Sequence, residues 1–368
     1  MSIFLRESFR HLPDVERKRI PPTPPHMVRL HRMERPNPFP EPLVQALRDA
    51  ASESTGRLYP DYAAFTRSLI THLARVEDLG RLDEDDICLG AGIEDFIRTL
   101  MLIFCERGEA VAYPWPTCAM FDVDAEKTFR LKPKRIRTEP FRRLTVDEVI
   151  SYIDDDTRLL ILPNPGQPVE TFFAHSGITR IAEACADKRC LVAIDEAYFG
   201  FGASSFIRHI DDHDNVIVLR TFSKAMGLAG ARVGYAVGPK PIIRALHGFR
   251  LSGEVAGPSM AMATTIMQWW PEVSRAVSEI AGMREWAKLR ILERGYRVEG
   301  SYGNHLLIEI NYPDRNPMIA SNVAARLERR GWAVRSGMPA PVDHHIMVTC
   351  GDRATMRDFV LDFEECLF

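Results

Sequence analysis

Residues 220–235 read RTFSKAMGLAGARVGY and directly follow the short apolar run Val216–Leu219. In this segment Lys224 comes after the hydroxyl of Ser223, and Arg232 follows the lysine by eight residues. A run of four residues rich in Val, Ile and Leu is typical of a strand buried on both faces of a parallel sheet. The segment therefore predicts a lysine and an arginine at the carboxyl end of a buried strand, where open α/β sheets bind ligands.

Two similar apolar runs precede this segment, at Arg158–Pro163 and Leu191–Ile194, and the helical pattern His175–Lys188 lies between them. Helical patterns also occur at Glu41–Ser52 and Glu94–Cys105, where apolar residues recur every three to four positions. Such alternation of strands and helices predicts an α/β fold with a mostly parallel central sheet. Residues 41–245 are predicted to form this large domain.

A different pattern begins near residue 246. We expect a long helix over Met260–Arg294, followed by strands at His305–Ile310 and His345–Cys350 with helices between and after them. The N-terminal residues 1–40 are rich in Pro and Arg, and their prolines, from Pro21 onward, predict an extended path. Residues 1–40 and 246–368 are therefore predicted to form a second, smaller α+β domain.

Composition excludes several classes of protein. The chain has 47 basic and 50 acidic residues, a net charge of −3, which argues against non-specific nucleic-acid binding. No apolar run is long enough to span a bilayer, and Met1–Arg10 lacks the apolar core of a signal peptide. The seven cysteines are scattered without metal or redox spacing, and adjacent His344 and His345 would point to opposite faces of a strand. We therefore expect a cytoplasmic protein without a metal site.

Polar residues follow each of the three buried strands. Asn164 and Gln167 come after the first, Asp195 ends the second, and Lys224 follows the third. This set suits pyridoxal 5′-phosphate (PLP), because the aldehyde of PLP needs one amine and its ring nitrogen needs a carboxylate to stay protonated. Lys224 is the candidate amine and Asp195 the candidate carboxylate.

Other residues nearby could bind the rest of the cofactor. Tyr198 and a side-chain amide, from Asn164 or Gln167, could donate to the phenolic oxygen. A phosphate needs hydroxyls, a bidentate arginine and backbone N–H groups at a helix N-terminus. The residues suited to that task are Thr221, Ser223, Arg232, Gly92, Ile93 and Glu94.

Each feature alone has a more ordinary explanation. An aspartate after a strand is often a cap, a Gly-x-Gly turn before a helix is weak evidence, and a single arginine is usually in a solvated ion pair. Their occurrence together at consecutive strand ends favours the PLP enzyme. A non-catalytic protein would not need the set Lys224, Asp195 and Arg232, and a nicotinamide dehydrogenase would need Gly-x-Gly-x-x-Gly after its first strand.

At this point the chain resembles a known family. Residues 27–360 are similar to fold-type I PLP enzymes, in the aminotransferase class I/II family and its histidinol-phosphate aminotransferase branch. The resemblance is carried by Arg220–Tyr235, by Asp195-Glu196-Ala197-Tyr198 (D-E-A-Y) and by Leu58-Tyr59-Pro60-Asp61 (R-Y-P-D in the family). It implies that Lys224 binds PLP covalently and that Asp195 pairs with the pyridinium. It also implies a homodimer in which Tyr59 reaches the phosphate in the neighbouring subunit's site.

The chain departs from this family at the substrate side. The family's N-P-N-N-P-T-G is replaced by Asn164-Pro165-Gly166-Gln167-Pro168, so the ring-oxygen partner is expected to be Asn164, with Gln167 as the alternative. The aromatic that stacks on the ring is replaced by Cys118, unless Trp115 or Phe121 takes its place.

Met347 stands where the family has an anion-binding arginine in L-R-I-T-V-G, whereas Arg335 matches a second family arginine. The N-terminal segment carries Arg32 and Arg35, and either Arg32 or Arg35 could restore binding of an anion. We therefore expect an aminotransferase that moves an amino group between a donor and a small, phosphorylated or otherwise anionic acceptor. The alternative is a PLP-dependent decarboxylase of an O-phospho-amino acid, similar to threonine-phosphate decarboxylase.

Overall fold

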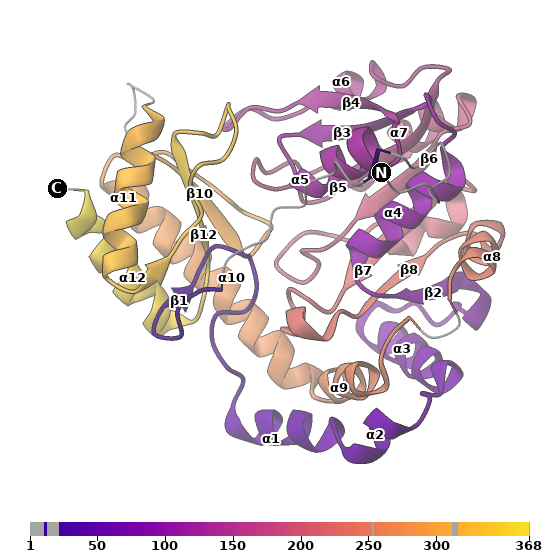
Figure 1. Cartoon of the computed structure of the whole chain (residues 1–368), viewed down its shortest axis with the longest axis horizontal. Helices are drawn as coiled ribbons and strands as arrows, with labels where there is room; N and C mark the ends of the chain where they lie inside the picture. Colours follow the sequence, from indigo (N-terminus) through magenta and orange to yellow (C-terminus); the bar gives the residue numbers. More distant parts are fainter. Residues whose placement is uncertain (1–10, 13–21, 252–253, 311–315, 368) are drawn as a thin grey trace.

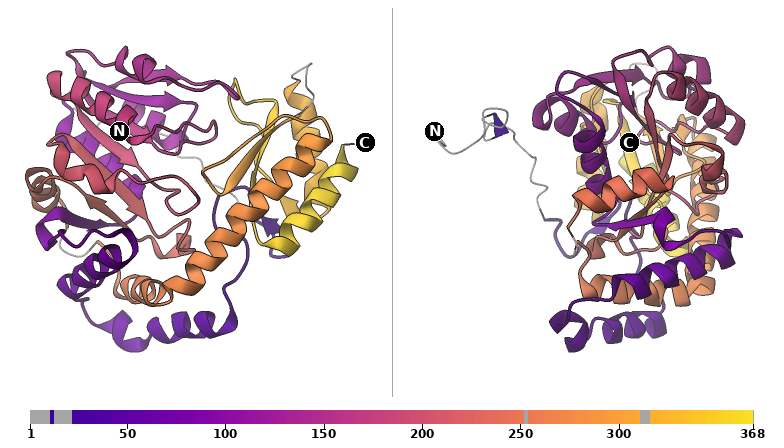
Figure 2. Two further views of the ribbon diagram at one scale, coloured as in Figure 1. Left: turned by 180° about the vertical axis from the view of Figure 1, so that it is seen from behind. Right: turned by 90° about the vertical axis from the view of Figure 1, so that its right-hand side faces the viewer.

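The computed structural model describes residues 11–12, 22–251, 254–310 and 316–367 (Figure 1). The expectations for Met1–Arg10 and for Pro21 lie outside the described residues. The chain forms two lobes, and the lobe that holds the larger sheet contains most of the chain (Figures 1 and 2).

The larger lobe is built on a seven-stranded sheet with the order β2-β8-β7-β6-β5-β3-β4. Neighbouring strands from β7 to β4 are parallel, and β8 is antiparallel to both of its neighbours. This confirms the predicted α/β fold with a mostly parallel sheet. The strands are β2 (Ile87–Gly90), β3 (Ala110–Trp115), β4 (Lys132–Arg137), β5 (Thr157–Pro163), β6 (Leu191–Asp195), β7 (Val216–Thr221) and β8 (Gly234–Val237).

Helices cover both faces of this sheet, which explains why its central strands are apolar on both sides. Alternate residues of β5, β6 and β7 pack into two separate cores, one with α4 and α8 and the other with α3 and α7. The helices of this lobe are α1 (Glu41–Ala50), α2 (Glu53–Arg57), α3 (Tyr62–Glu77), α4 (Ile93–Phe104), α5 (Ala119–Asp122), α6 (Val146–Ile150), α7 (His175–Asp187) and α8 (Lys240–Phe249).

The smaller lobe has an antiparallel sheet with the order β12-β10-β9 and a two-stranded sheet that pairs β1 with β11. Because β1 comes from the N-terminal segment, both ends of the chain contribute to this lobe. The division at residue 245 stays a prediction. The remaining elements are β1 (Val28–Arg29), α9 (Gly257–Gln268), α10 (Trp270–Glu293), β9 (Val298–Glu299), β10 (His305–Glu309), α11 (Pro317–Arg329), β11 (Trp332–Ala333), β12 (His345–Thr349) and α12 (Arg353–Cys366).

The predicted single helix over Met260–Arg294 is wrong. The structure has two helices, α9 and α10, that meet at Trp269. Pro271 lies in the first turn of α10, where its missing N–H costs nothing, but it cannot continue the preceding helix. As a result α9 lies beside α1, α2 and α3, and α10 runs from there to the smaller lobe (Figure 1).

Two smaller findings bear on the expectations from composition. All seven cysteines are free thiols, five of them buried. Among the described residues, no helix combines the length and the apolar character needed to cross a membrane.

Two carboxylates connect the lobes beside the loop after β5. Glu299 of β9 accepts hydrogen bonds from the backbone N–H groups of Phe141 (2.7 Å) and Glu170 (2.6 Å). Glu170 in turn accepts from the N–H groups of Ser301 (2.8 Å) and Tyr302 (2.7 Å). Burial, together with the nearby charge of Glu170, raises the pKa of Glu299 to about 7. Each carboxylate thus accepts hydrogen bonds from backbone N–H groups of the opposite lobe.

This arrangement predicts a pH-dependent loss of stability that Glu299→Gln removes. The carboxyl of Glu299 has a higher pKa in the folded chain than its ordinary value of 4.5, so its stabilising contribution is complete below pH 4.5 and lost as pH rises through 7. We therefore expect the variant to become more stable relative to the native chain as the pH rises. The difference in the free energy of unfolding, variant minus native, should increase by about 1–3 kcal/mol between pH 5 and pH 8. Urea unfolding at both pH values measures this difference, and a difference that does not change with pH would contradict the prediction.

Candidate active site

The predicted chemical groups meet at the carboxyl edge of the large sheet. Pro163 of β5 pairs with Asp195 of β6, and Asp195 pairs with Leu219 of β7. Asn164 therefore starts the loop beside Asp195, and its backbone N–H donates to the Asp195 carbonyl (2.9 Å). Lys224 follows the end of β7 by three residues. The structure confirms that the three strand ends bring these side chains to one edge.

Lys224 is held in a largely enclosed position between the lobes. Its Nζ donates a hydrogen bond to the backbone carbonyl of Arg32 (3.0 Å), in the N-terminal segment. Burial lowers the pKa of Lys224 to about 8, and the charges of Glu34, Cys118 and Asp195 act in the opposite direction. An amine with this pKa is partly neutral near pH 7, which both nucleophilic attack and proton transfer require.

Asp195 lies at the end of β6 beside the buried Tyr198. The Asp195 carboxylate accepts a hydrogen bond from the N–H of Ala197 (2.9 Å). Burial raises the pKa of Asp195 to about 6, while the charge of Lys224 lowers it. Burial and the charge of Asp195 raise the pKa of the Tyr198 phenol above its ordinary value, so that it stays a donor. The site therefore offers one carboxylate and one neutral phenol next to the lysine.

A cradle for an anion lies at the N-terminus of α4. Gly92, which has no side chain to cap the helix, precedes it with a φ of 91°, and the backbone N–H groups of Ile93 and Glu94 belong to its first turn. The guanidinium of Arg232 reaches the carbonyl of Ala91 and the hydroxyl of Ser223, both at 3.4 Å. Among the residues that the structure describes, Arg232 has no carboxylate partner.

The same cradle requires glycine and brings in a second hydroxyl. A Cβ at Gly234 would lie 2.7 Å from the Cα of Gly92, so only glycine lets the two segments approach this closely. Thr221 donates to the hydroxyl of Ser223 (2.8 Å). Two hydroxyls, one arginine and the N-terminus of a helix are the groups that bind a phosphate.

The structure bears on the choice of amide for the ring oxygen. The Asn164 side chain already makes two hydrogen bonds to Phe173, because its Nδ2 donates to the Phe173 carbonyl (3.1 Å) and its Oδ1 accepts from the Phe173 N–H (2.7 Å). In contrast, Oε1 of Gln167 is buried without a hydrogen-bond partner among the described residues. A buried amide without a partner is the kind of group that a ligand satisfies. The structure therefore favours the alternative, Gln167, whose Nε2 would donate to the ring oxygen, and the choice between the two amides stays a prediction.

Because Asn164 binds backbone and Gln167 does not, replacing each amide by alanine is expected to have a different effect. Asn164→Ala leaves two buried backbone groups of Phe173 without partners, and we expect it to lower the free energy of unfolding by about 2–4 kcal/mol. Gln167→Ala is expected to change that free energy by less than about 1 kcal/mol but to weaken PLP binding by about tenfold. Urea unfolding and PLP titration separate the two effects. A large loss of PLP affinity in Asn164→Ala at unchanged stability would contradict the assignment.

Cys118 stands at the place in the sequence where the family has an aromatic residue that stacks on the ring. Burial raises the pKa of its thiol, and the nearby charges of Glu94 and Asp195 act in the same direction. The two alternative aromatics are engaged elsewhere: Trp115 donates to Asp122 (3.1 Å), and Phe121 packs edge-on against Tyr113. The structure therefore favours the thiol over either aromatic.

On the substrate side, Arg335 and Met347 are direct neighbours. Their backbones form an antiparallel bridge with hydrogen bonds of 3.0 and 2.8 Å, so their side chains share one face. The Met347 side chain is fully buried, and within the described ranges Arg335 has no ion pair. Arg32 contributes its carbonyl to Lys224, while its buried Nε lacks a hydrogen-bond partner among those residues.

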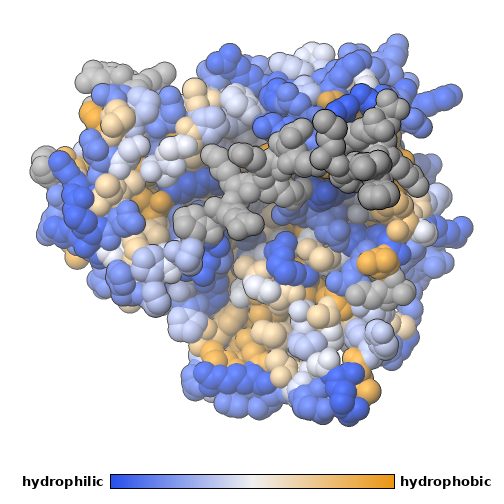
Figure 3. Space-filling view, in the orientation of Figure 1, coloured by the Kyte–Doolittle hydropathy of each residue, from blue (hydrophilic) through white to orange (hydrophobic). Residues whose placement is uncertain are grey.

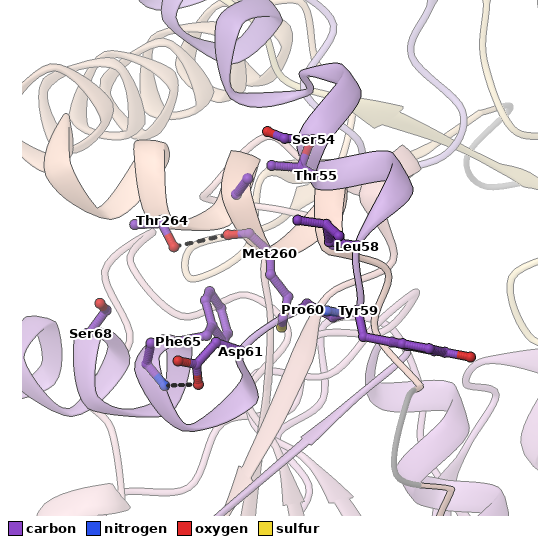
Figure 4. A pocket seen from close by; sticks show the side chains of 13 residues that line it. Ser54, Thr55, Leu58, Tyr59, Pro60, Asp61, Phe65, Ser68, Met260 and Thr264 are labelled. Carbon is purple, nitrogen blue, oxygen red and sulfur yellow. Dashed lines mark hydrogen bonds between the residues drawn. The ribbon is translucent and has the colours of Figure 1, made fainter.

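Tyr59 lies outside the site of its own chain. It precedes α3, its side chain is 100% exposed, and in Figure 4 the ring extends away from the other labelled side chains. The pocket of about 410 Å³ beside it is lined by residues of α2, α3 and α9. Hydrophobic surface gathers toward this end of the molecule (Figure 3).

Sequence reasoning missed the buried charges that hold the strand ends. Arg220 forms ion pairs with both Glu77 of α3 and Glu196, which directly follows Asp195. Arg220 also donates to Ser205 (2.6 Å), and its guanidinium lies 3.6 Å from the centre of the Phe199 ring. The network ties the residue before Thr221 to the residue after Asp195. Nothing in the local pattern around Glu77 indicates this role.

Contrary to the expectation for adjacent histidines, His344 and His345 do place ligand atoms near one another, together with Glu309. However, Glu309 forms ion pairs with Arg297 (3.0 Å) and His344 (3.1 Å), so a cation would have to compete with a guanidinium. A second group, His175, His209 and Asp212, is partly exposed, and its two imidazoles are tilted by 35° with centroids 3.4 Å apart.

Comparison with known proteins gives consistent results. The sequence pattern of the family Aminotransferase class I and II matches residues 32–360. The chain is 29% identical over 319 residues to a histidinol-phosphate aminotransferase from Jannaschia sp. (strain CCS1), which covers 86% of this chain and 85% of that one. It is 30% identical over 271 residues to an aromatic amino acid aminotransferase from Rhodococcus erythropolis (strain PR4 / NBRC 100887), covering 73% of this chain and 74% of the relative.

Among solved structures, histidinol-phosphate aminotransferase from Sinorhizobium meliloti in complex with pyridoxal-5′-phosphate superposes with a TM-score of 0.81. The identity is 21%, and the match covers 92% of this chain and 90% of that one. At this identity the superposition shows the fold, and it agrees with the predicted fold type I.

Proposed function

Because the chain belongs to the aminotransferase class I and II family, we propose that this PLP-dependent aminotransferase acts on a small anionic substrate and works as a homodimer. The observation that supports the proposal most strongly is the meeting of Lys224, Asp195 and the cradle around Arg232 at one sheet edge. That set matches the amine, the carboxylate and the anion site that PLP requires.

The position of each site residue indicates which part of the cofactor or substrate it would contact. When bound, PLP supplies an electron sink for the α-carbon of the substrate. Asp195 would keep the ring nitrogen protonated, and Tyr198 and Gln167 would donate to the phenolic oxygen. Arg232, Thr221, Ser223 and the N-terminus of α4 would hold the phosphate. Lys224, whose pKa is about 8, would accept the proton of the substrate α-carbon as a base and donate it again as an acid.

We infer the substrate class from the cationic side chains of the site that are not assigned to the cofactor. Met347 provides no charge, whereas Arg335 beside it has no ion pair within the described residues and can bind one anionic group. An amine substrate with a phosphate but no carboxylate, such as histidinol phosphate, fits one such arginine. The relatives reported above are named as aminotransferases, and a decarboxylase would also have to hold a carboxylate out of the ring plane.

A substrate panel tests this assignment. Histidinol phosphate, O-phosphothreonine, phenylalanine and tyrosine are each incubated with the PLP-loaded protein and 2-oxoglutarate, and glutamate and carbon dioxide are measured. We expect glutamate from an anionic amine and no carbon dioxide. Release of carbon dioxide from O-phosphothreonine without glutamate formation would support the decarboxylase instead. Met347→Arg, with Met347→Leu as its control, is expected to raise the affinity for amino-acid carboxylates by about tenfold or more.

The homodimer is proposed from Tyr59 and its surroundings. A fully exposed tyrosine beside the exposed Leu58 and an open apolar pocket is typical of a surface that a second subunit covers. In such a dimer the phenol of Tyr59 would reach the anion cradle of its partner. A cytoplasmic location is proposed from the seven free cysteines, since oxidising compartments favour disulfides.

Complementation between two defective subunits tests the shared site. Lys224→Ala and Tyr59→Ala are expected to be inactive or weakly active alone at limiting PLP. Co-expressed, they form hybrid dimers in which one of the two sites has both native residues, so activity is expected to return to about a quarter of the native value. Absence of recovery in isolated hybrid dimers would contradict a contribution of Tyr59 across the interface.

A further inference from the structure

His305 projects from the smaller lobe toward the catalytic lysine. It begins β10, it is 1% exposed, and its ring centre lies 5.2 Å from that of Tyr198. Lys224 Nζ lies 6.0 Å from the same Tyr198 ring on the large lobe. A Cβ at Gly303 would come within 2.7 Å of the imidazole, so the glycine lets the ring lie flat against the backbone. The imidazole therefore borders the space above Lys224 and Tyr198.

This imidazole is neutral and lacks a hydrogen-bond partner at one nitrogen. Burial, followed by the charges of Lys224, Arg284 and Arg335, lowers the pKa of His305 to about 3. Its Nδ1 is buried without a partner among the described residues. A neutral imidazole has one donor and one acceptor nitrogen. Because Nδ1 and Cε1 lie against the backbone of Gly303, the opposite edge of the ring, which carries Nε2, is the one that can form a hydrogen bond with a bound substrate.

The neighbours of His305 on the sheet define what kind of group can approach. Antiparallel pairing with β12 places His305 opposite Thr349 and Leu307 opposite Met347, all on one face. The Thr349 hydroxyl already accepts from the N–H of Met33 (2.9 Å). Leu307 and Met347 are apolar, and Arg335 is the cation on this face. On this face His305 is therefore the neutral polar side chain, and Arg335 is the cation.

We propose that His305 is a specificity-determining residue that forms a hydrogen bond with an uncharged polar group of the substrate, while Arg335 binds its anionic group. A cationic group is disfavoured there by Lys224, Arg284 and Arg335, and the anionic group of the substrate is bound by Arg335 rather than by the neutral ring. The inference rests on the proposed function, because it names the substrate of the same site more closely. Heteroaromatic N–H and hydroxyl groups have the required chemistry.

The test uses amines that differ in one such group. Histidinol phosphate is paired with phenylalaninol phosphate, and tyrosine with phenylalanine. Dissociation constants come from the shift of the cofactor absorption band in the absence of an acceptor, which needs no turnover. For the pair that binds, the native protein is expected to prefer the polar member by about tenfold or more. His305→Phe should reduce that preference to about threefold or less, and His305→Gln should retain part of it.

A second buried histidine provides the control. His72 of α3 is also neutral, with a pKa lowered to about 4, and it packs edge-on against Trp270 away from Lys224. His72→Phe should leave the preference unchanged. An unchanged preference in His305→Phe, with the native cofactor band, would overturn the inference while leaving the proposed function intact. If none of the four amines binds the native protein, the proposed substrate class fails and the inference fails with it.

Discussion

Replacing Lys224 by alanine is expected to reduce the transamination rate by at least about 10⁴-fold, because both the covalent hold on the cofactor and the proton-transfer group are lost. The cradle around Arg232 and the Asp195 carboxylate remain in this variant, so PLP still binds, although without its bond to the chain. Single-turnover rates with the amine substrate, followed through the cofactor absorption band, measure the loss.

Two controls separate chemistry from folding. Lys240→Ala removes a lysine of α8 that forms a surface ion pair with Asp83, and it should leave the rate unchanged. Added ethylamine should restore part of the activity of Lys224→Ala, because a free amine can occupy the space that the side chain leaves. Native-like rates in Lys224→Ala without an added amine would contradict the role of this lysine.

Replacing Asp195 by asparagine is expected to reduce the rate by about 10³-fold while the fold is retained. Asparagine can still accept the hydrogen bond from the N–H of Ala197, but it cannot stabilise a positive charge on the ring nitrogen. Because the pKa of Asp195 is about 6, the native protein itself should bind PLP more weakly as the pH falls below 6.

Asp195→Glu is the matched variant, since it keeps the charge but moves it by one methylene. We expect it to retain more activity than Asp195→Asn. PLP titrations between pH 5 and pH 8, with the rates of both variants, check the account. A rate for Asp195→Asn within a few-fold of the native rate would contradict it.

The parts of the molecule that sequence predicted correctly depend on local pattern. The strands β5, β6 and β7 follow from short runs of Val, Ile and Leu, and their polar ends must meet because parallel strands share one edge. Lys224 and Asp195 are therefore placed by the sequence itself, without knowledge of distant contacts.

The parts that were wrong or missed depend on contacts between distant segments. The amide of Asn164 binds the backbone of Phe173, and the spacing in the sequence does not reveal this contact, which favours Gln167 as the partner of the ring oxygen. The break between α9 and α10 was visible as Pro271, yet the apolar period continues across it. His305 reads as an ordinary strand residue until Tyr198 is brought beside it by the approach of the two lobes.

The central claim is that Lys224 is the residue that holds PLP covalently. Borohydride reduction of the PLP-loaded protein makes the bond between cofactor and lysine permanent, and peptide mass spectrometry then locates the added mass. The account predicts one reduced cofactor per chain, on the peptide that contains Lys224, and none in Lys224→Ala. A chain that takes up no cofactor mass, or takes it up on a surface lysine such as Lys240, would contradict it.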